Sequence, residues 1–259
     1  HAPFVGRSAF AHKGGIHVSA VQKNPLTYEH IAPEQVGNCR RIVVSEQAGL
    51  SNILSKVAEF GIRLDKSDPQ ARLILERLKT LELQGYQFEA AEASFELLVR
   101  ELLGQRSHPF EVLSFNVSTT TRSDWSSKDW DPSGEATEVQ SLAAVKIAVQ
   151  GQTRVTAAEG NGPVAALDGA LRKALLEFYP QLEGIHLADY KVRILDGRAG
   201  TSAKTRVLVE FSDGHRRWTT VGVSTNIIEA SCRALVEGFE YSLLAEPCFS
   251  PPSAQIASP

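Results

Sequence analysis

The chain has 259 residues, of which 42% are hydrophobic and 22% charged, and its formal net charge is -3. These values fit an ordinary soluble globule of one or two domains, and the acidic balance argues against a nucleic-acid surface. We expect no membrane-spanning segment and no signal peptide. Three unpatterned cysteines favour a reducing compartment, which we expect to be the cytoplasm. The lack of methionine leads us to expect a piece of a longer chain.

The first segment, residues 1–54, mixes glycines, prolines and histidines with short apolar pieces, so we expect an irregular linker subdomain. Only residues 16–21 and 41–44 look regular, as a helical turn and a short strand. Proton transfer could involve His17, Tyr28 and His30, because imidazole titrates near neutrality and a phenol can donate to a developing oxyanion. Spacing alone favours the other interpretation of an isolated histidine, a hydrogen-bonded loop residue.

A metal site within the chain is not predicted. His12 and His17 are five residues apart across two glycines, whereas a helical zinc pair is four apart. No cysteine or carboxylate stands at ligand spacing beside them.

The second segment, residues 55–106, has apolar residues at helical spacing and predicts a small subdomain of three helices. The breaks between them fall at Asp68-Pro69 and at residues 84–86. The third helix is expected to run unbroken from Phe88 to Leu103.

The third segment, residues 107–245, contains a repeat. Residues 156–178 are echoed by residues 220–239, with Gly162 aligned on Asn226 at an offset of 64 residues. Each copy predicts an amphipathic helix after three strands of alternating apolar and polar residues. One such unit buries too little by itself, so the copies should pack together or against a partner chain. The sequence therefore predicts an α+β fold in which small helical linker subdomains precede a duplicated βββα domain.

Details of the two copies differ. The first helix has an apolar stripe that runs from Val164 to Phe178. The second begins with Asn226 and Glu229 at the spacing of a capping box.

Two polar stretches are expected to be loops. Residues 122–137 join the first two strands of the first copy, and their Trp125 and Trp130 could form a contact surface or fold back onto the sheet. Residues 246–259 are expected to be a flexible tail.

Long stretches of the chain resemble the family of 2-isopropylmalate, citramalate and homocitrate synthases. The linker that follows the catalytic barrel in that family is similar to GRSAFAHKGGIHVSAVQKNPLTYEHIAPEQVGN. The two halves of the family's C-terminal regulatory domain, of the LeuA dimerisation type, resemble GNGPVAALDGALRKAL and TTVGVSTNIIEASCRAL. The runs HVSAVQKNPLTYEHI and VSEQAGLSNI look most like the citramalate synthase branch.

The resemblance implies an acyltransferase that condenses acetyl-CoA with a 2-oxo acid in a Claisen-type reaction. The divalent metal and acetyl-CoA would bind the N-terminal catalytic barrel, so this chain would hold no cofactor and would be inactive alone. The family's linker enters the active site of the other subunit, and the matching positions are His17, Asn24 and Tyr28. His17 would help to deprotonate the acetyl group, while Tyr28 and Asn24 would bond a reacting oxygen. His12 matches a family position with a structural role.

The resemblance also implies a homodimer that binds a branched-chain amino acid, isoleucine or leucine, for feedback inhibition. The turn at Gly160-Asn161-Gly162 could supply N–H groups for the carboxylate, although such a turn is more often only a tight link from strand to helix. Small residues are expected to leave room for the side chain. A bulky residue at Gly160 is expected to abolish binding without unfolding the domain. The expected effector residues are Ala158, Gly160, Asn161, Gly162, Pro163, Gly222, Ser224, Asn226 and Ile227.

Other functions stay open. The chain could belong to a 2-isopropylmalate synthase of leucine biosynthesis, or it could be a stand-alone amino-acid-sensing or interaction module. A nucleic-acid-binding sheet is opposed by the acidic balance. The 2-oxo acid is selected by the barrel, so this sequence does not identify it.

Overall fold

The computed structural model describes residues 2, 4–6, 9–12, 15–43, 49–122 and 138–244. The chain forms two compact units: one contains the residues up to Arg106 together with Leu244, and the other is Ser107–Leu243. The finer division of the first unit at residue 54 stays a prediction. Trp125 and Trp130 of the expected loop, and the tail 246–259, lie outside the described residues. Within the described ranges, no helix is long and apolar enough to cross a membrane.

The first unit begins with a small two-stranded sheet and short helices. The strands β1 (Ala11–His12) and β2 (Arg41–Ile42) pair in parallel. Between them lie the helix α1 (Gly15–Lys23) and the 3-10 helices η1 (Pro25–Thr27) and η2 (Pro33–Val36). The expected helical turn at residues 16–21 is thus a full helix, and the strand expected at 41–44 begins where predicted.

The rest of the first unit is helical: α2 (Leu50–Glu59), α3 (Pro69–Leu83), η3 (Phe88–Ala90) and α4 (Glu92–Leu102). The prediction of one helix from Phe88 to Leu103 was wrong, because Ala91 leaves the helical region with φ -134° and ψ 68°. In one helix, residues seven apart are separated by about 10.5 Å along the axis. The break instead lets the buried rings of Phe88 and Phe95 meet at 6.0 Å.

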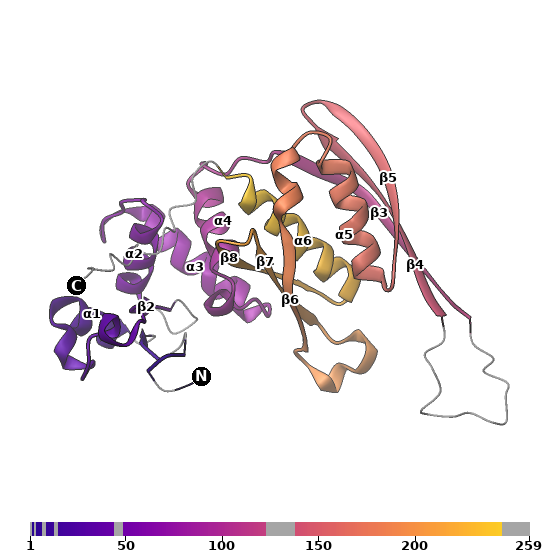
Figure 1. Cartoon of the computed structure of the whole chain (residues 1–259). Helices are drawn as coiled ribbons and strands as arrows, with labels where there is room; N and C mark the ends of the chain where they lie inside the picture. Colours follow the sequence, from indigo (N-terminus) through magenta and orange to yellow (C-terminus); the bar gives the residue numbers. More distant parts are fainter. Residues whose placement is uncertain are drawn as a thin grey trace, which may run out of the picture. The chain divides into compact units, whose positions relative to one another are not determined.

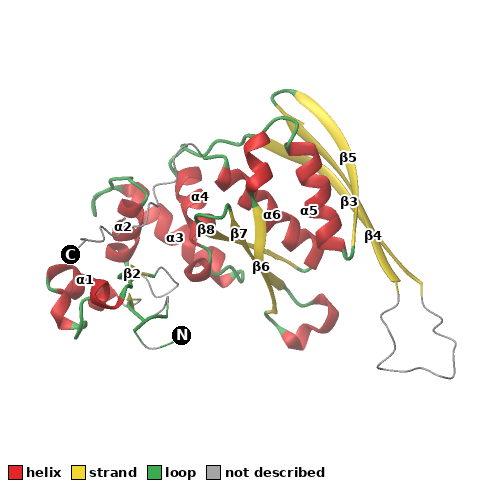
Figure 2. Ribbon diagram, in the orientation of Figure 1, coloured by secondary structure: helices red, strands yellow, loops and turns green. Residues whose placement is uncertain are grey.

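The second unit confirms the duplicated βββα architecture (Figure 1). Its first copy comprises β3 (Phe110–Arg122), β4 (Glu138–Val149), β5 (Gln152–Gly160) and α5 (Pro163–Leu175). After η4 (Pro180–Gly184), the second copy comprises β6 (His186–Ile194), η5 (Gly197–Ser202), β7 (Thr205–Ser212), β8 (Arg217–Ser224) and α6 (Ile227–Ser242). Each sheet is antiparallel, with the strands in chain order (Figure 2).

The first two strands of the first sheet are longer than the stretches that apolar alternation predicts, residues 112–118 and 145–149. The β3–β4 ladder continues to the pair Arg122 and Glu138, beyond the last partner of β5, where Gly160 pairs with Ser141. The β4–β5 hairpin turns at Gln150 and Gly151, both with positive φ, as a tight two-residue hairpin requires.

The helices α5 and α6 contact one another and lie side by side (Figure 1). The expected apolar stripe of α5 is correct at its centre, since Leu167, Leu171 and Leu175 are fully buried. Its expected ends, Val164 and Phe178, are only half-buried. A column of buried small residues takes up the rest of the packed surface: Ala166, Ala170 and Ala174. Small residues let the helix approach its strands closely.

Candidate functional site

The structure brings together two of the three predicted linker residues. The His17 ring, on α1, stacks on the Tyr28 ring at the end of η1, with ring centroids 4.2 Å apart and an interplanar angle of 21°. Both side chains are exposed. An imidazole and a phenol therefore present two proton-transfer groups side by side on the surface.

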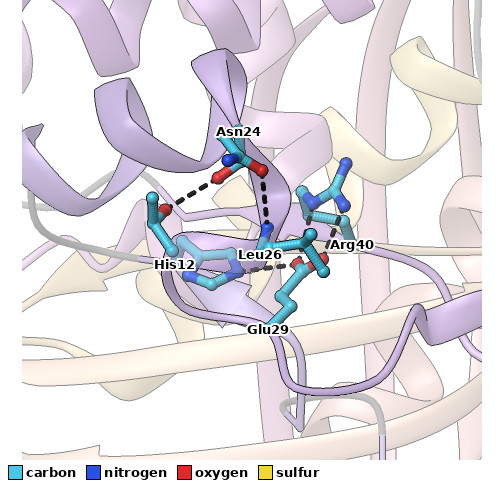
Figure 3. Close-up of polar contacts among 6 residues, drawn as sticks. His12, Asn24, Leu26, Glu29 and Arg40 are labelled. Carbon is cyan, nitrogen blue, oxygen red and sulfur yellow. Dashed lines mark hydrogen bonds and ion pairs between the residues drawn. The ribbon is translucent and has the colours of Figure 1, made fainter.

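Asn24 holds the turn that joins these two residues. Its Oδ1 accepts a hydrogen bond from the Leu26 N–H at 3.1 Å, and its carbonyl oxygen accepts one from Thr27 Oγ1 at 2.8 Å (Figure 3). Asn24 is thus the N-cap of η1. Its amide nitrogen could donate to a substrate oxygen, because the cap engages only the amide oxygen.

The residue after Tyr28 is a buried carboxylate that sequence reasoning missed. Glu29 is 4% exposed and accepts hydrogen bonds from Arg40 Nε at 2.7 Å and Arg40 Nη2 at 2.5 Å. It also bonds His12 Nε2 at 2.9 Å, so His12 occupies a structural place (Figure 3). The pKa of Glu29 lies below its ordinary value, chiefly because Arg40 donates to the carboxylate. Sequence periodicity does not predict the pairing of Glu29 with Arg40 and His12, because these residues are 11 and 17 positions away from it.

The predicted effector region lies in the second unit, where the two repeats share one internal hydrogen bond. Thr156 Oγ1 donates to the Ala170 carbonyl at 2.7 Å, and Thr220 Oγ1 donates to the Ala234 carbonyl at 2.7 Å. The two hydrogen bonds are equivalent in the repeat, because each residue of the second lies 64 positions after its counterpart in the first. The last strand of each copy is therefore fixed to its helix in the same way.

The expectation that glycines leave room for a ligand was wrong for two of them. A β-carbon at Gly160 would lie 2.5 Å from the Ala166 nitrogen, and one at Gly222 would lie 1.9 Å from the Ala230 oxygen. The helix backbone already fills the space that each missing side chain leaves. The expectation that a bulky residue at Gly160 leaves the domain folded stays a prediction, and the close helix backbone argues against it.

The N-terminus of α6 is closed by its own side chains. Asn226 Oδ1 accepts from the N–H groups of Ile228 at 2.8 Å and Glu229 at 3.3 Å. The predicted capping box is only half present, because Glu229 does not return to the Asn226 N–H. Instead Ser224 Oγ accepts that N–H at 3.0 Å and donates to Glu229 Oε2 at 2.6 Å. Ser224 and Asn226, both expected to contact an effector, are thus engaged within the turn.

The N-terminus of α5 differs. Its cap residue, Gly162, has no side-chain oxygen to offer, and Pro163 follows at the first helical position. The N–H groups of Val164 and Ala165 come next, and the first turn of a helix leaves such groups without helical partners. An anion would therefore find donors at α5, whereas the equivalent donors of α6 are taken.

A partly buried ion pair lies further along α5 and was also missed. Arg172 Nε donates to Asp168 Oδ2 at 2.7 Å, and the guanidinium lies 5.0 Å from the centre of the Phe239 ring. Burial raises the pKa of Asp168, and Arg172 opposes that shift. The equivalent position in the second copy is Cys232, whose pKa burial raises to about 11.

A cavity of about 640 Å³ lies at the opposite end of the first sheet from these turns. It is bounded by the start of β3, by the β4–β5 hairpin and by Val236 and Glu240 of α6. None of the nine expected effector residues lines it. The effector hypothesis therefore rests on the turn at α5 and not on this cavity.

Comparison with known proteins identifies the class of this fold. Residues 89–243 match the model of the LeuA allosteric (dimerisation) domain, and residues 4–85 match the homocitrate synthase post-HMGL domain-like family. The chain belongs to the family of LeuA allosteric (dimerisation) domains, preceded by a linker of the homocitrate synthase type.

Two individual relatives are similar to nearly the whole of this chain. The chain is 64% identical over 248 residues to an (R)-citramalate synthase of Synechocystis sp., covering 96% of this chain and 44% of that protein. It is 51% identical over 243 residues to the (R)-citramalate synthase of Geobacter sulfurreducens, covering 94% of this chain and 44% of that protein. The chain thus spans less than half the length of the relatives it matches.

Proposed function

We propose that this chain is the regulatory and dimerisation part of a citramalate synthase that isoleucine inhibits. The observation that carries the proposal is a duplicated βββα unit of the LeuA allosteric type in a chain 64% identical to an (R)-citramalate synthase. The intact enzyme would form a carbon–carbon bond between acetyl-CoA and a 2-oxo acid. The chain alone would be inactive, because the catalytic barrel would lie outside it.

The divalent metal is assigned to that barrel. The residues that the structure describes contain no group of three or more His, Cys, Asp or Glu side chains placed to hold a metal ion. The part proposed for this chain in the reaction is proton transfer and hydrogen bonding by the linker residues.

The linker residues are proposed to act in the active site of the partner subunit. The His17 imidazole would take a proton from the acetyl methyl group or orient the group that does so. The Tyr28 hydroxyl and the Asn24 amide nitrogen would donate to the oxygen on which negative charge develops. Their support is the exposure and the stacking of the two rings at 4.2 Å.

The effector is proposed to place its carboxylate on the α5 turn. The N–H groups after Pro163 would receive it, because the corresponding groups of α6 already bond Asn226. Other expected residues, such as Ala158 and Ile227, would then surround the apolar side chain. Inhibition requires that the effector bind two states of the dimer unequally, with a coupling of about 1–3 kcal/mol.

Calorimetric titration of the chain with isoleucine, leucine and valine, together with its mass in solution, tests this proposal. We expect a dimer that prefers isoleucine. Preference for leucine would instead support a 2-isopropylmalate synthase, and binding by a monomer would support a stand-alone sensing module. A well-folded dimer that binds none of the three would reduce the repeat to a dimerisation scaffold.

A further inference from the structure

Glu29 and its partners Arg40 and His12, called the anchor below, hold the backbone at residue 29 in place. A glutamate is seldom buried unless it is paired, and Glu29 meets this condition with three hydrogen bonds to Arg40 and His12. The two bonds from Arg40 are a bidentate fork, which fixes direction as well as distance. The backbone at Glu29 therefore has a defined position within the first unit.

The anchor connects three separate pieces of the linker. His12 lies in β1, Arg40 directly precedes β2, and the Glu29 N–H closes η1 by donating to the Pro25 carbonyl at 3.0 Å. The two strands are themselves paired, since the Val43 N–H donates to the His12 carbonyl at 3.0 Å. A single carboxylate thus ties η1 to the two-stranded sheet (Figure 3).

The sheet is in turn tied to the helices of the same unit. Arg41 Nη2 bonds Glu92 Oε1 at 3.1 Å, and Lys56 Nζ lies 3.4 Å from the same oxygen. Glu92 begins α4 and Lys56 belongs to α2. The anchor therefore rests on the helical part of the unit.

Tyr28 needs such support. Its side chain is 44% exposed, and the contact described for its ring is the stack on His17, which is also exposed. An exposed pair cannot be held by core packing, so its placement depends on the backbone beneath it. Catalysis is sensitive to that placement, because a shift of about 1 Å can cost roughly 100-fold in rate.

We propose that Glu29, held by Arg40 and His12, is a positioning residue that fixes the His17–Tyr28 pair in the orientation it presents to the reacting substrate. The inference rests on the proposed function of His17 and Tyr28. Glu29 itself touches no substrate and acts through the turn that carries Tyr28.

The first experiment reads the ring stack directly by proton NMR of this chain. A histidine ring stacked on a phenol has upfield-shifted ring protons, and we expect this shift for His17. Glu29→Gln should move the His17 signals to the positions of an unstacked ring. The matched control is Glu34→Gln, at an exposed glutamate of η2, which should leave the signals in place.

The second experiment measures steady-state kinetics of the intact synthase that carries this chain. Glu29→Gln should lower kcat by roughly 10- to 100-fold and change the KM of either substrate by less than about threefold, because an interaction that orients catalytic groups is lost. Glu34→Gln should keep the kcat of the parent. An upfield His17 signal together with the parent's kcat in Glu29→Gln would overturn the inference.

A third variant decides the matter if Glu29→Gln does not fold. Arg40→Lys keeps the positive charge beside Glu29 but removes the bidentate fork. Loss of the stack and a lower kcat would support the inference, and the parent's values for both would contradict it. His17→Ala separates this inference from the proposed function: an unchanged kcat would refute the catalytic role of His17, while the NMR experiment still tests the anchor.

Discussion

The two βββα repeats join strand to helix with the same hydrogen bond but begin their helices differently. Thr156 and Thr220 bond equivalent carbonyls of α5 and α6 at the same distance of 2.7 Å. At the helix start, Asn226 caps α6, whereas Gly162 gives α5 no side-chain cap. The copies thus share their packing and differ in which backbone donors remain for a ligand. The difference separates a structural turn from a candidate binding turn.

The largest expected effect concerns the close contact between strand and helix. Gly222→Ala should lower the free energy of unfolding by about 3 kcal/mol, because the new β-carbon would lie 1.9 Å from the Ala230 oxygen. Gly160→Ala should also destabilise, since its β-carbon would lie 2.5 Å from the Ala166 nitrogen. Urea unfolding measures both. Gly162→Ala is the control, since nothing lies within 4 Å of its added carbon. Equal stabilities of all three variants would refute the contact.

The second largest effect concerns the N-terminal caps of α5 and α6, which differ between the repeats. Asn226→Ala removes the acceptor of two N–H groups and should cost about 1 kcal/mol of unfolding free energy. Gly162→Ala removes no acceptor and should change stability by less than about 0.5 kcal/mol. Thermal and urea unfolding of the two variants provide the comparison. A cost as large at Gly162 as at Asn226 would contradict the assignment of an uncapped α5.

The shared hydrogen bond should give similar losses in both repeats. Thr156→Val and Thr220→Val keep the shape of the side chain and remove one donor, so each should cost about 1 kcal/mol. Urea unfolding of each single variant measures the loss of unfolding free energy. A loss confined to one repeat would show that the strand and helix of the two copies are not held alike.

The equivalent positions Asp168 and Cys232 should give different pH profiles. Burial raises the pKa of Cys232 from 9.0 to about 11, so its stabilising contribution is complete below pH 9.0 and is lost as the pH rises toward 11. At pH 9.5 that loss should be about 0.8 kcal/mol. The difference in unfolding free energy between the parent and Cys232→Ala should be smaller at pH 9.5 than at pH 7 by this amount. A constant difference would contradict the shifted thiol.

Asp168 should respond in the acid range instead. Because its folded pKa is raised above 3.8, protonation favours the folded state, and the penalty for its ionised form is relieved as the pH falls through the folded pKa toward 3.8. An NMR titration of the Asp168 carboxyl carbon should therefore have a midpoint above 3.8. A midpoint at or below that value would show that the bond from Arg172 outweighs burial.

The repeat was predictable because local sequence patterns determine its strands and helices. The alternation of 145–149 and the spacing of Leu167, Leu171 and Leu175 are set by the geometry of one strand and one helix. The polar extension of β3 and β4 was not predictable, since Thr119 to Thr121 pair across the sheet without an apolar signature. The break at Ala91 depends on how Phe88 packs on Phe95, which is a tertiary contact.

The candidate site residues stay predictions, and the sequence suggested only some of the residues that surround them. His17, Asn24 and Tyr28 were found through their likeness to a family, and the structure adds the stack between two of them. Glu29 escaped notice because its partners Arg40 and His12 are 11 and 17 residues away. The asymmetry of the turns depends on where the Ser224 and Glu229 side chains point, which sequence spacing leaves undecided.

The central claim, that only the first repeat offers its helix N-terminus to an effector, is tested most directly by calorimetric titration of isoleucine into three variants. Gly162→Asn would supply an internal oxygen to the donors of α5 and should weaken binding at least 10-fold, which is a loss of about 1.4 kcal/mol. Gly162→Ala, which adds bulk without an acceptor, and Asn226→Gly, which opens the other turn, should bind within about threefold of the parent. Undiminished binding by Gly162→Asn, or a loss confined to Asn226→Gly, would contradict the account.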